Sequence, residues 1–532
     1  MAEGPDGEGA GFGAEGPRGA GPGFGARQIV GAAALLAGSQ VLSRLLGVVR
    51  EAVLAAQVGR GAEADAYLAA FAIPDLLNHF LAGGALTIAF IPLYHRAREQ
   101  GGAPAAERLF ATVLGTVGVL ALLATGLAWV SAESLVAWQF PRFDAAQQAH
   151  TVRLTRIVLP AQVFFLTGGI LRAVLMAEGR FGAQAVSGLL YNLAIIAGGL
   201  LVAPVIGVEG FAWGALLGSI AGPFGVGWLQ LRRRGPVRVR VAFADRDFLA
   251  YLALAAPLMV GVTLATVDEW FGRWFGGLGP EGTMATLGYA RKLMQTPVAV
   301  VGQALGTAAL PTLSRLFAEG QHARLNDLVH RTLTASAGLG LLAAAAVLVT
   351  ADALVTLVYV RGAFSAADGL RVADALRVYT AAIPGFVIQA IAVRAFYARG
   401  EMWRPMLLGT GIGLLAIPLY LQAVTHGAPG LAAAASLAIA TSAVATLAYA
   451  RRRFGGPVLL PLLVSVLRST LIAAAAAAVA SVVPDQGADA LGALATLALR
   501  GLAFSAVALP LAWWIGDPEL RDLFKRLPGS SP

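Results

Sequence analysis

The chain has 532 residues, of which 57% are hydrophobic and only 13% are charged, and its mean hydropathy is +0.72. A soluble protein of this length would need far more charge on its surface, so the composition excludes one and predicts a polytopic membrane protein. The net charge of +9 is scattered over short segments without a basic groove, which excludes nucleic-acid binding. There is no cysteine, no spaced set of metal ligands and no Walker A lysine, so we expect no disulfide, metal centre or ATP-binding loop.

The beginning of the chain, residues 1–27, is Gly-rich and polar and has no periodicity. Such a segment cannot bury a core, so we predict a disordered tail. It lacks the basic start of a signal peptide, and the apolar run after it is too long for one. We therefore expect the first apolar segment to be retained as a membrane helix.

Fourteen apolar segments reach the roughly 20 residues that a helix needs to cross a bilayer. The sequence therefore predicts an all-α fold with fourteen transmembrane helices. Their expected limits are 29–58, 64–95, 109–136, 151–177, 183–206, 209–231, 247–273, 283–314, 328–357, 371–398, 405–425, 428–450, 459–483 and 489–515.

The charge of the connecting segments predicts the orientation of the chain. If both termini are cytoplasmic, the inside segments hold 22 arginines and lysines, and the outside loops hold only 3, namely Arg60, Arg142 and Arg361. This bias follows the positive-inside rule. We therefore predict an even number of helices and two cytoplasmic termini.

The chain also repeats itself with a period of about 220 residues: AFIPLYHRAREQG at 89–101 resembles AALPTLSRLFAEG at 308–320, and Gly179 is matched by Gly400. A period that holds six spans predicts two six-helix lobes in the same orientation around a central cavity. The predicted organisation is a tail at 1–27, an N-lobe at 28–235, a C-lobe at 236–455, two additional helices at 456–516 and a cytoplasmic tail at 517–532.

The first predicted span carries charges near its middle, where each ionised side chain costs about 2.5–3.5 kcal/mol on insertion scales. Glu51 shares the helix face of Arg44, and Arg50 lies about 120° around the helix. One interpretation is an Arg44–Glu51 pair that neutralises charge between helices. The excess of positive charge favours a second interpretation, an anion site in a watery cavity, because guanidinium groups bind phosphate with two parallel hydrogen bonds.

Other charges inside predicted spans cluster in the first two helices of each half, so we predict a cationic chamber formed by spans 1, 2, 7 and 8. Arg172 and Arg394 occur singly in other spans, where snorkelling at a cytoplasmic helix end explains them equally well. We expect Lys292 to belong to the anion site of this chamber, or else to snorkel or to pair with Asp268 or Glu269. Asp65 and Asp75 of span 2 either pair with the arginines or have a purely structural role. The residues of spans 2, 7 and 8 that we assign to this chamber by their charge or titratable group are Asp65, Asp75, His79, Asp268, Glu269, Arg273, Arg291 and Lys292.

Four stretches of the chain resemble the MurJ (MviN) family of lipid II flippases in the MOP superfamily, and the likeness extends over roughly residues 30–515. These stretches are SRLLGVVREAVLAAQVGRGAEADAYLAAFAIPDLL at 43–77, GGALTIAFIPLY at 83–94, GYARKLMQTPVAVVGQALGTAALPTLSRLF at 288–317 and RGAF at 361–364. The resemblance implies two lobes, a V-shaped cavity and alternating access. It also implies a substrate, the undecaprenyl-diphosphate-linked peptidoglycan precursor, carried outward across the bacterial cytoplasmic (inner) membrane.

The resemblance also assigns candidate substrate-binding residues. The two essential arginines of the family's first helix match Arg44 and Arg50, and the aspartate of its second helix matches Asp65. The arginine of that second helix falls on Asn78 here, beside His79. The Asp-Arg pair of helix 8 reads Arg291–Lys292.

The expected energy source is the membrane potential or an ion. Some members of the family bind sodium through acids and amides of helices 7 and 11. Asp268 could serve in this chain, together with Glu51 and Glu269 as ion or charge-pair candidates, but span 11 has no Asn or Asp, so sodium coupling is not expected. We expect no cofactor, and a monomer among membrane lipids.

Several other functions stay open. The same fold would serve a flippase for another polyprenyl-diphosphate-linked oligosaccharide, or a MATE-like exporter. A glycosyltransferase or polymerase needs an acid or base at the external face, where the longest outside loops offer only Asp144 and Asp368, so we do not expect an enzyme. A non-transporting scaffold for envelope machinery has little reason to keep charge in a cavity.

Overall fold

The computed structural model describes residues 26–81, 85–260 and 264–525. Within these ranges every regular element is a helix and none is a strand. Lipid offers no hydrogen-bond partner to the backbone, so long apolar runs satisfy their own N–H and C=O groups as helices. The predicted all-α membrane fold is confirmed, whereas the predicted tail at 1–27 lies almost wholly outside the described residues.

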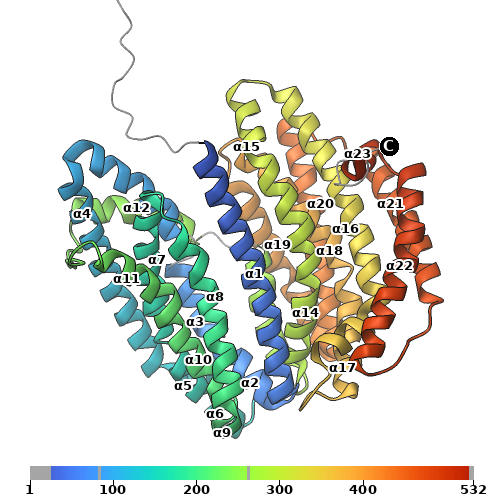
Figure 1. Ribbon diagram of the computed structural model, residues 1–532, viewed down its shortest axis with the longest axis horizontal. Coiled ribbons are helices and arrows are strands. Elements are labelled where there is room, and N and C mark those ends of the chain that lie inside the picture. Colours follow the sequence, from blue (N-terminus) through green and yellow to red (C-terminus); the bar gives the residue numbers. More distant parts are fainter. Residues whose placement is uncertain (1–25, 82–84, 261–263, 526–532) are drawn as a thin grey trace, which may run out of the picture.

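The first half of the chain forms one group of helices, drawn in blue to green in Figure 1. Its longest helix, α4, is broken at Gly101 and Gly102, where the backbone leaves helical geometry, so the predicted spans on either side meet at a bend. The elements are α1 (Ala26–Val58), α2 (Ala62–Ala70), α3 (Ala72–Leu81), α4 (Ala85–Val130), α5 (Ala132–Gln139), α6 (Ala145–Val158), α7 (Ala161–Ala177), α8 (Gly182–Ala197), η1 (Gly198–Val202), α9 (Ala203–Ile206), α10 (Glu209–Ser219), η2 (Ile220–Val226) and α11 (Gly227–Arg232).

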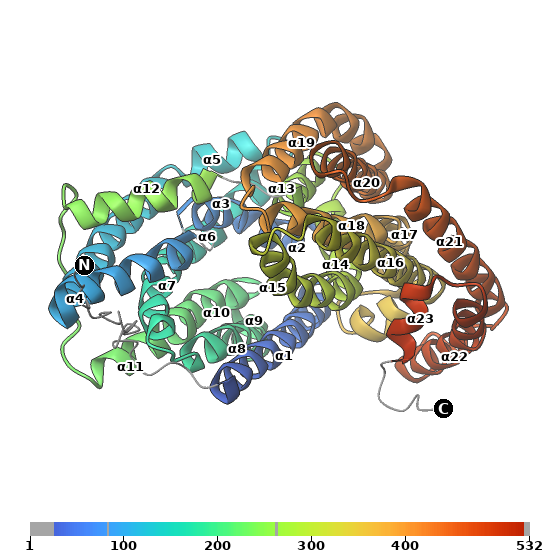
Figure 2. The ribbon, with the colours of Figure 1, turned by 90° about the horizontal axis from the view of Figure 1, so that it is seen from above.

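The second half lies beside the first and ends in a C-terminal pair, α21 and α22, at the far edge of the molecule (Figure 2). Its elements are α12 (Arg246–Val260), α13 (Leu264–Gly277), α14 (Thr283–Val298), η3 (Ala299–Gln303), α15 (Ala304–Ala318), α16 (His322–Tyr359), α17 (Ala366–Tyr379), α18 (Ala382–Tyr397), α19 (Trp403–Ala423), η4 (Val424–His426), α20 (Gly427–Phe454), α21 (Leu459–Ser481), α22 (Ala490–Trp514) and α23 (Pro518–Lys525).

Among the described residues, eight helical stretches are long and apolar enough to cross a membrane, or nine if α17 and α18, bent by 45°, form one span. One stretch, Trp403–Phe454, covers the two predicted spans 405–425 and 428–450. With the bent pair counted, four predicted spans have no counterpart in this set: 29–58, 64–95, 247–273 and 283–314. They are the charge-bearing first two spans of each half. The count of fourteen therefore stays a prediction.

The sequence repeat reappears in the backbone. Gly179 and Gly400 both end a helix with a positive φ, at 76° and 75°. Gly207 and Gly427 do the same, at 67° and 62°. A left-handed φ is cheap only for glycine, so the matched glycines place matched turns between helices.

The helix after the predicted lobe boundary at 235 packs against the first half. α12 contributes Phe248, Tyr251 and Ala255 to a buried apolar cluster that also contains residues of α4 and α7. α13 instead packs on α14, α19 and α20 of the second half. The segment α12–α13 therefore links the two groups of helices.

The start of α1 and the helix α23 lie at the same end of the molecule (Figure 1). A chain that crosses the membrane an even number of times brings its two ends to the same side in this way. The opposite end holds the α1–α2 turn and the start of α14 and α17 (Figure 1).

Candidate functional site

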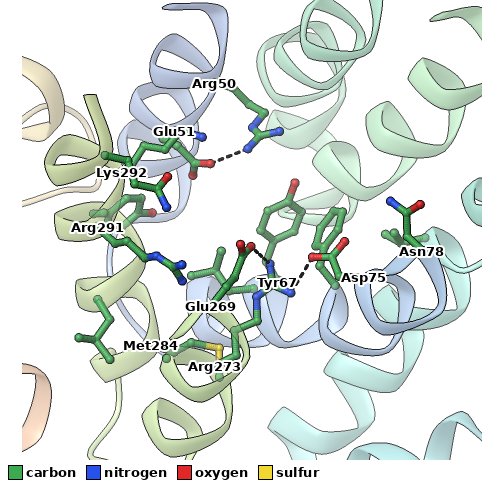
Figure 3. A pocket seen from close by; sticks show the side chains of 18 of the residues that line it. Arg50, Glu51, Tyr67, Asp75, Asn78, Glu269, Arg273, Met284, Arg291 and Lys292 are labelled. Atoms are coloured by element: carbon green, nitrogen blue, oxygen red, sulfur yellow. Dashed lines mark hydrogen bonds and ion pairs between the residues drawn. The ribbon is translucent and has the colours of Figure 1, made fainter. Parts of the chain in front are cut away.

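A pocket of about 420 Å³ lies where the two halves meet, and residues of α1, α2, α3, α6, α7, α8, α13, α14 and α17 line it. Four of its lining side chains are cationic: Arg50, Arg273, Arg291 and Lys292. Three are acidic: Glu51, Asp75 and Glu269. The described lining therefore carries one more cation than anion. Arg291 and Lys292 enter from one side and Asp75 and Asn78 from the other (Figure 3).

The α1 wall of the pocket is organised around Arg50. Its Nη2 donates to Glu51 Oε1 at 2.7 Å, and its Nη1 donates to Asn192 Oδ1 at 3.4 Å. Asn192, on α8, is held in turn because its Nδ2 donates to Gly188 O at 2.9 Å and to Ser43 Oγ at 3.2 Å. The acid of this span therefore pairs with Arg50, which lies next to it in sequence, and the proposed Arg44–Glu51 pair is replaced. Adjacent side chains can meet because both lean toward the pocket.

A second ion-pair group connects the halves across the pocket. Arg273 of α13 pairs with Asp75 of α3 at 2.6 Å and with Glu269, one turn earlier, at 3.0 Å. Among the described ion pairs, Asp75 is thus joined to Arg273 of predicted span 7, and not to the span 1 arginines Arg44 and Arg50. Because Asp75 and Arg273 lie 198 residues apart in the chain, this contact depends on the packing of the two halves.

The α14 wall supplies the two adjacent cations Arg291 and Lys292. Lys292 reaches across to α1, where a Cβ built on Gly47 would lie 3.5 Å from its Nζ. Glu269 pairs with Arg273, and among the described residues no carboxylate forms an ion pair with Lys292. The side chain of Asp268 lies outside the described residues, so that predicted pairing is not tested.

Asp65 does not line this pocket, although the sequence predicts it in the substrate site. It is 2% exposed, and its two carboxylate oxygens accept the backbone N–H groups of Gly282 and Ala285, both at 2.7 Å. These N–H groups stand at the start of α14, where a helix has free donors and a partial positive charge that favour a carboxylate. Asp65 therefore joins α2 to α14.

Further contacts at this end close a seam between the halves, which we call the α1–α2 seam. Arg60 Nε pairs with Asp368 Oδ1 at 2.9 Å, and Arg60 Nη1 donates to Thr286 Oγ1 at 3.2 Å. Glu281 accepts the backbone N–H of Ala62 at 2.9 Å. The sequence predicts this end to face the outside, because Arg60 belongs to one of its outside loops.

The remaining predicted site residues fall into two groups. Asn78 lines the pocket. Arg44 lies on an exposed part of α1 and is not among the lining residues of this pocket, and neither is His79, whose ring meets that of Trp270 edge-on at 5.1 Å. Of the predicted residues, the structure thus brings together Arg50, Glu51, Asn78, Glu269, Arg291 and Lys292.

Sequence reasoning did not select several residues that shape the pocket. Asp75 and Arg273 were counted among the charges of the predicted chamber, but not among its candidate binding residues. Gln162, Phe165 and Tyr191 also line the pocket, but amides and aromatic rings are ordinary in membrane helices and give no signal of their own. Only the packing of α7 and α8 identifies them.

Comparison with known proteins gives a consistent result. A family model described as "Lipid II flippase MurJ" matches residues 54–494. The "Probable lipid II flippase MurJ" of Rhizobium meliloti is 29% identical over 513 residues, which cover 92% of this chain and 94% of the relative. The "Lipid II flippase MurJ" of Burkholderia cenocepacia is 28% identical and covers 71% of this chain and 75% of its own length.

Solved structures agree on the fold. "Lipid II flippase MurJ, inward closed conformation" matches with a TM-score of 0.77 at 20% identity, covering 92% of this chain and 99% of that one. An inward-facing multidrug resistance MATE family transporter of the MOP superfamily matches with a TM-score of 0.67 at 13% identity, covering 80% and 98%.

Proposed function

Since the chain belongs to the lipid II flippase MurJ family, we propose that it carries lipid II from the inner to the outer leaflet of the membrane by alternating access. The observation that carries this proposal is the pocket between the halves, which combines four cations with three acids. A diphosphate cannot cross hydrocarbon bare, and fixed cations in a watery pocket replace part of its lost hydration.

In this proposal the diphosphate binds between the α1 and α14 walls. Arg50, Arg291 and Lys292 face it directly, and Arg273 balances Asp75 and Glu269. Arg44, about one and a half turns from Arg50, meets the diphosphate at an earlier stage of transport, before it reaches the pocket. Asn78 offers an amide beside the charged groups, and Asp65 acts through the seam.

The inside-negative membrane potential is the energy source that we favour over an ion. Moving a negative charge outward along this potential is favourable by about 2.3 kcal/mol for each charge at 100 mV. Collapse of the potential in proteoliposomes at constant ion concentrations should then slow flipping. If only the removal of one ion slowed flipping, ion coupling would replace this mechanism.

We further propose a monomer in the bacterial cytoplasmic (inner) membrane with both termini in the cytoplasm. The same-end position of α1 and α23 supports the shared location of the termini, and the loop charges support the direction. The natural chain has no cysteine, so Pro236→Cys can report orientation without background. A membrane-impermeant thiol reagent should label it only after lysis, and labelling in intact cells would reverse the topology.

The test of function is complementation of a conditional lipid II flippase mutant, combined with flipping of lipid II by the purified protein. The parent chain should restore growth and flip lipid II, while Arg50→Ala should insert normally and lose most of the flipping. Failure of the parent chain in both assays, with export of a cationic drug instead, would favour the MATE-like alternative. A chain that flipped another polyprenyl-diphosphate-linked oligosaccharide but not lipid II would keep the mechanism and change the substrate.

A further inference from the structure

The pocket has two chemically different walls. Its charges come from α1, α3, α13 and α14, whereas the lining residues contributed by α6, α7 and α8 are uncharged. These are Val158, Gln162, Phe165 and Tyr191, which we call the neutral wall. Gln162 and Phe165 lie three residues apart on α7 and so share one helix face. The Phe165 and Tyr191 rings meet edge-on at 5.1 Å.

Gln162 is the residue of this wall that indicates a polar ligand. It is 3% exposed and lines the pocket, and its buried Oε1 accepts no hydrogen bond from the described part of the chain. Buried acceptors without a donor are rare because their lost hydration is not replaced. A donor supplied by a bound molecule would satisfy Gln162, and an alkyl chain has none to offer.

We propose that the neutral wall binds a sugar, specifically an N-acetylated pyranose joined directly to the diphosphate. Such a ring has C–H faces that pack on aromatic rings, and hydroxyl and acetamido N–H groups that donate to an amide oxygen. This inference rests on the proposed function, because the diphosphate held by the cationic walls places the attached sugar beside it. The cationic walls then hold the charge, and the neutral wall distinguishes a glycosylated carrier from a bare one.

The test compares two ligands on the purified full chain: undecaprenyl diphosphate, and undecaprenyl diphosphate that carries one N-acetylated hexosamine. We expect Gln162→Leu, and separately Phe165→Leu, to weaken binding of the glycosylated ligand about three- to tenfold, the usual range for one neutral contact, and to leave the bare ligand unchanged. Gln139→Leu is the matched control, because Gln139 is buried on α5 and does not line this pocket. Lys292→Gln should weaken the binding of both ligands by the same factor.

Two results would overturn this inference, and they are distinguishable. If the parent protein binds both ligands and neither leucine variant changes their ratio, the neutral wall does not bind the sugar, and the proposed function stands. If the parent protein binds neither ligand, the proposed function fails and the sugar site fails with it. Thermal unfolding of each variant checks that the effect does not come from a loss of fold.

Discussion

At the scale of the single residue, Arg50 shows how a costly intramembrane charge is held ready for a ligand. Glu51 neutralises one edge of the guanidinium, and the longer contact with Asn192 restrains the other. Asn192 is itself 8% exposed and anchored to α1 and α8. We infer that Asn192 is a positioning residue, which acts on the substrate through Arg50.

Replacing Asn192 with leucine should therefore weaken binding of undecaprenyl diphosphate about three- to tenfold, less than the loss of a direct charge-assisted contact, because Arg50 keeps its charge and loses only the hydrogen bond that positions it. In an Arg50→Gln background the same change should have almost no further effect, because its action passes through Arg50. Asn326→Leu is the control. Asn326 also accepts a hydrogen bond from an arginine, Arg399, and donates one to the backbone of Phe454, but these contacts lie within the second half and away from the pocket. Additive losses in the double variant would contradict the positioning role.

Lys292 provides a test of charge as such, because no described carboxylate pairs with it and it extends toward Gly47. Lys292→Arg should keep most of the flipping activity, while Lys292→Gln should reduce it about tenfold or more through the loss of one charge-assisted contact. Activity is measured at matched expression in proteoliposomes. A Gln variant as active as the parent would remove Lys292 from the site.

At the scale of the element, glycines determine how closely the helices of the first half pack. α8 and its η1 extension approach α10 at a glycine-lined contact: a Cβ on Gly198 would lie 2.3 Å from Gly210 O, and one on Gly214 would lie 2.7 Å from Ala194 O. Small residues at such contacts let backbones approach closely where lipid gives no hydrophobic drive for association. This packing places Tyr191 of α8 at the pocket and Asn192 beside Arg50.

Gly214→Ala should accordingly destabilise the protein by about 1–3 kcal/mol, because the added methyl group meets backbone atoms that cannot move independently. Gly126→Ala on α4 is the matched control, since nothing lies within 4 Å of its added Cβ. There alanine should be neutral or stabilise the helix by about 0.5–1 kcal/mol. Thermal unfolding in detergent distinguishes the two variants, and equal stability of both would mean that the close contact is not needed.

At the scale of the whole molecule, the α1–α2 seam joins the halves at the predicted external end, so this structure is closed on that side. Its polar contacts lie beside a buried apolar cluster that joins Ala55 and Ala64 to the second half, so opening this side in each transport cycle has to separate both. Arg60 is the central residue of the seam, because it reaches both α17 and α14.

Removing that contact should favour the outward-open state. In proteoliposomes, an Asn78→Cys reporter in the pocket should react with an external impermeant thiol reagent several-fold faster when Arg60→Gln is also present. The control is Arg153→Gln, which breaks an ion pair with Glu209 inside the first half alone. Equal rates for Arg60→Gln and the control would mean that Arg60 does not hold the seam.

The same seam should respond to acid. Partial burial raises the pKa of Asp368, but hydrogen bonds from Ser365 and Arg60 outweigh burial, and the net pKa is lowered. A lowered pKa means that the contribution of Asp368 is complete above its unfolded pKa, near 3.9, and is lost as pH falls through the lower folded value. The reagent reacts with the thiolate, whose population falls with pH, so labelling is divided at each pH by that of the Arg60→Gln reporter, in which this ion pair is already absent. This ratio should rise only at strongly acidic external pH. It should be less pH-dependent in Asp368→Asn, and the same acid response in that variant would exclude Asp368 as its cause.

The sequence alone determined the fold class and the location of the charged chamber. Membrane-spanning length and loop charge are local properties of the chain, and a charge inside an apolar run is visible because it is costly there. Arg50, Arg291 and Lys292 were predicted in this way, and the structure brings them to one pocket. The repeat was visible too, because the turn glycines are fixed by backbone conformation.

The tertiary structure alone decided which partners these groups have. Asp75 pairs with Arg273, and Asp65 with the start of α14, because packing brings these atoms together from distant parts of the chain. Glu51 pairs with its neighbour Arg50, because both side chains lean toward the same pocket. The neutral wall had no sequence signal, since glutamine and aromatic residues cost little in a membrane helix. Only the packing of α7 and α8, which turns Gln162, Phe165 and Tyr191 toward the pocket, identifies these residues as part of the site.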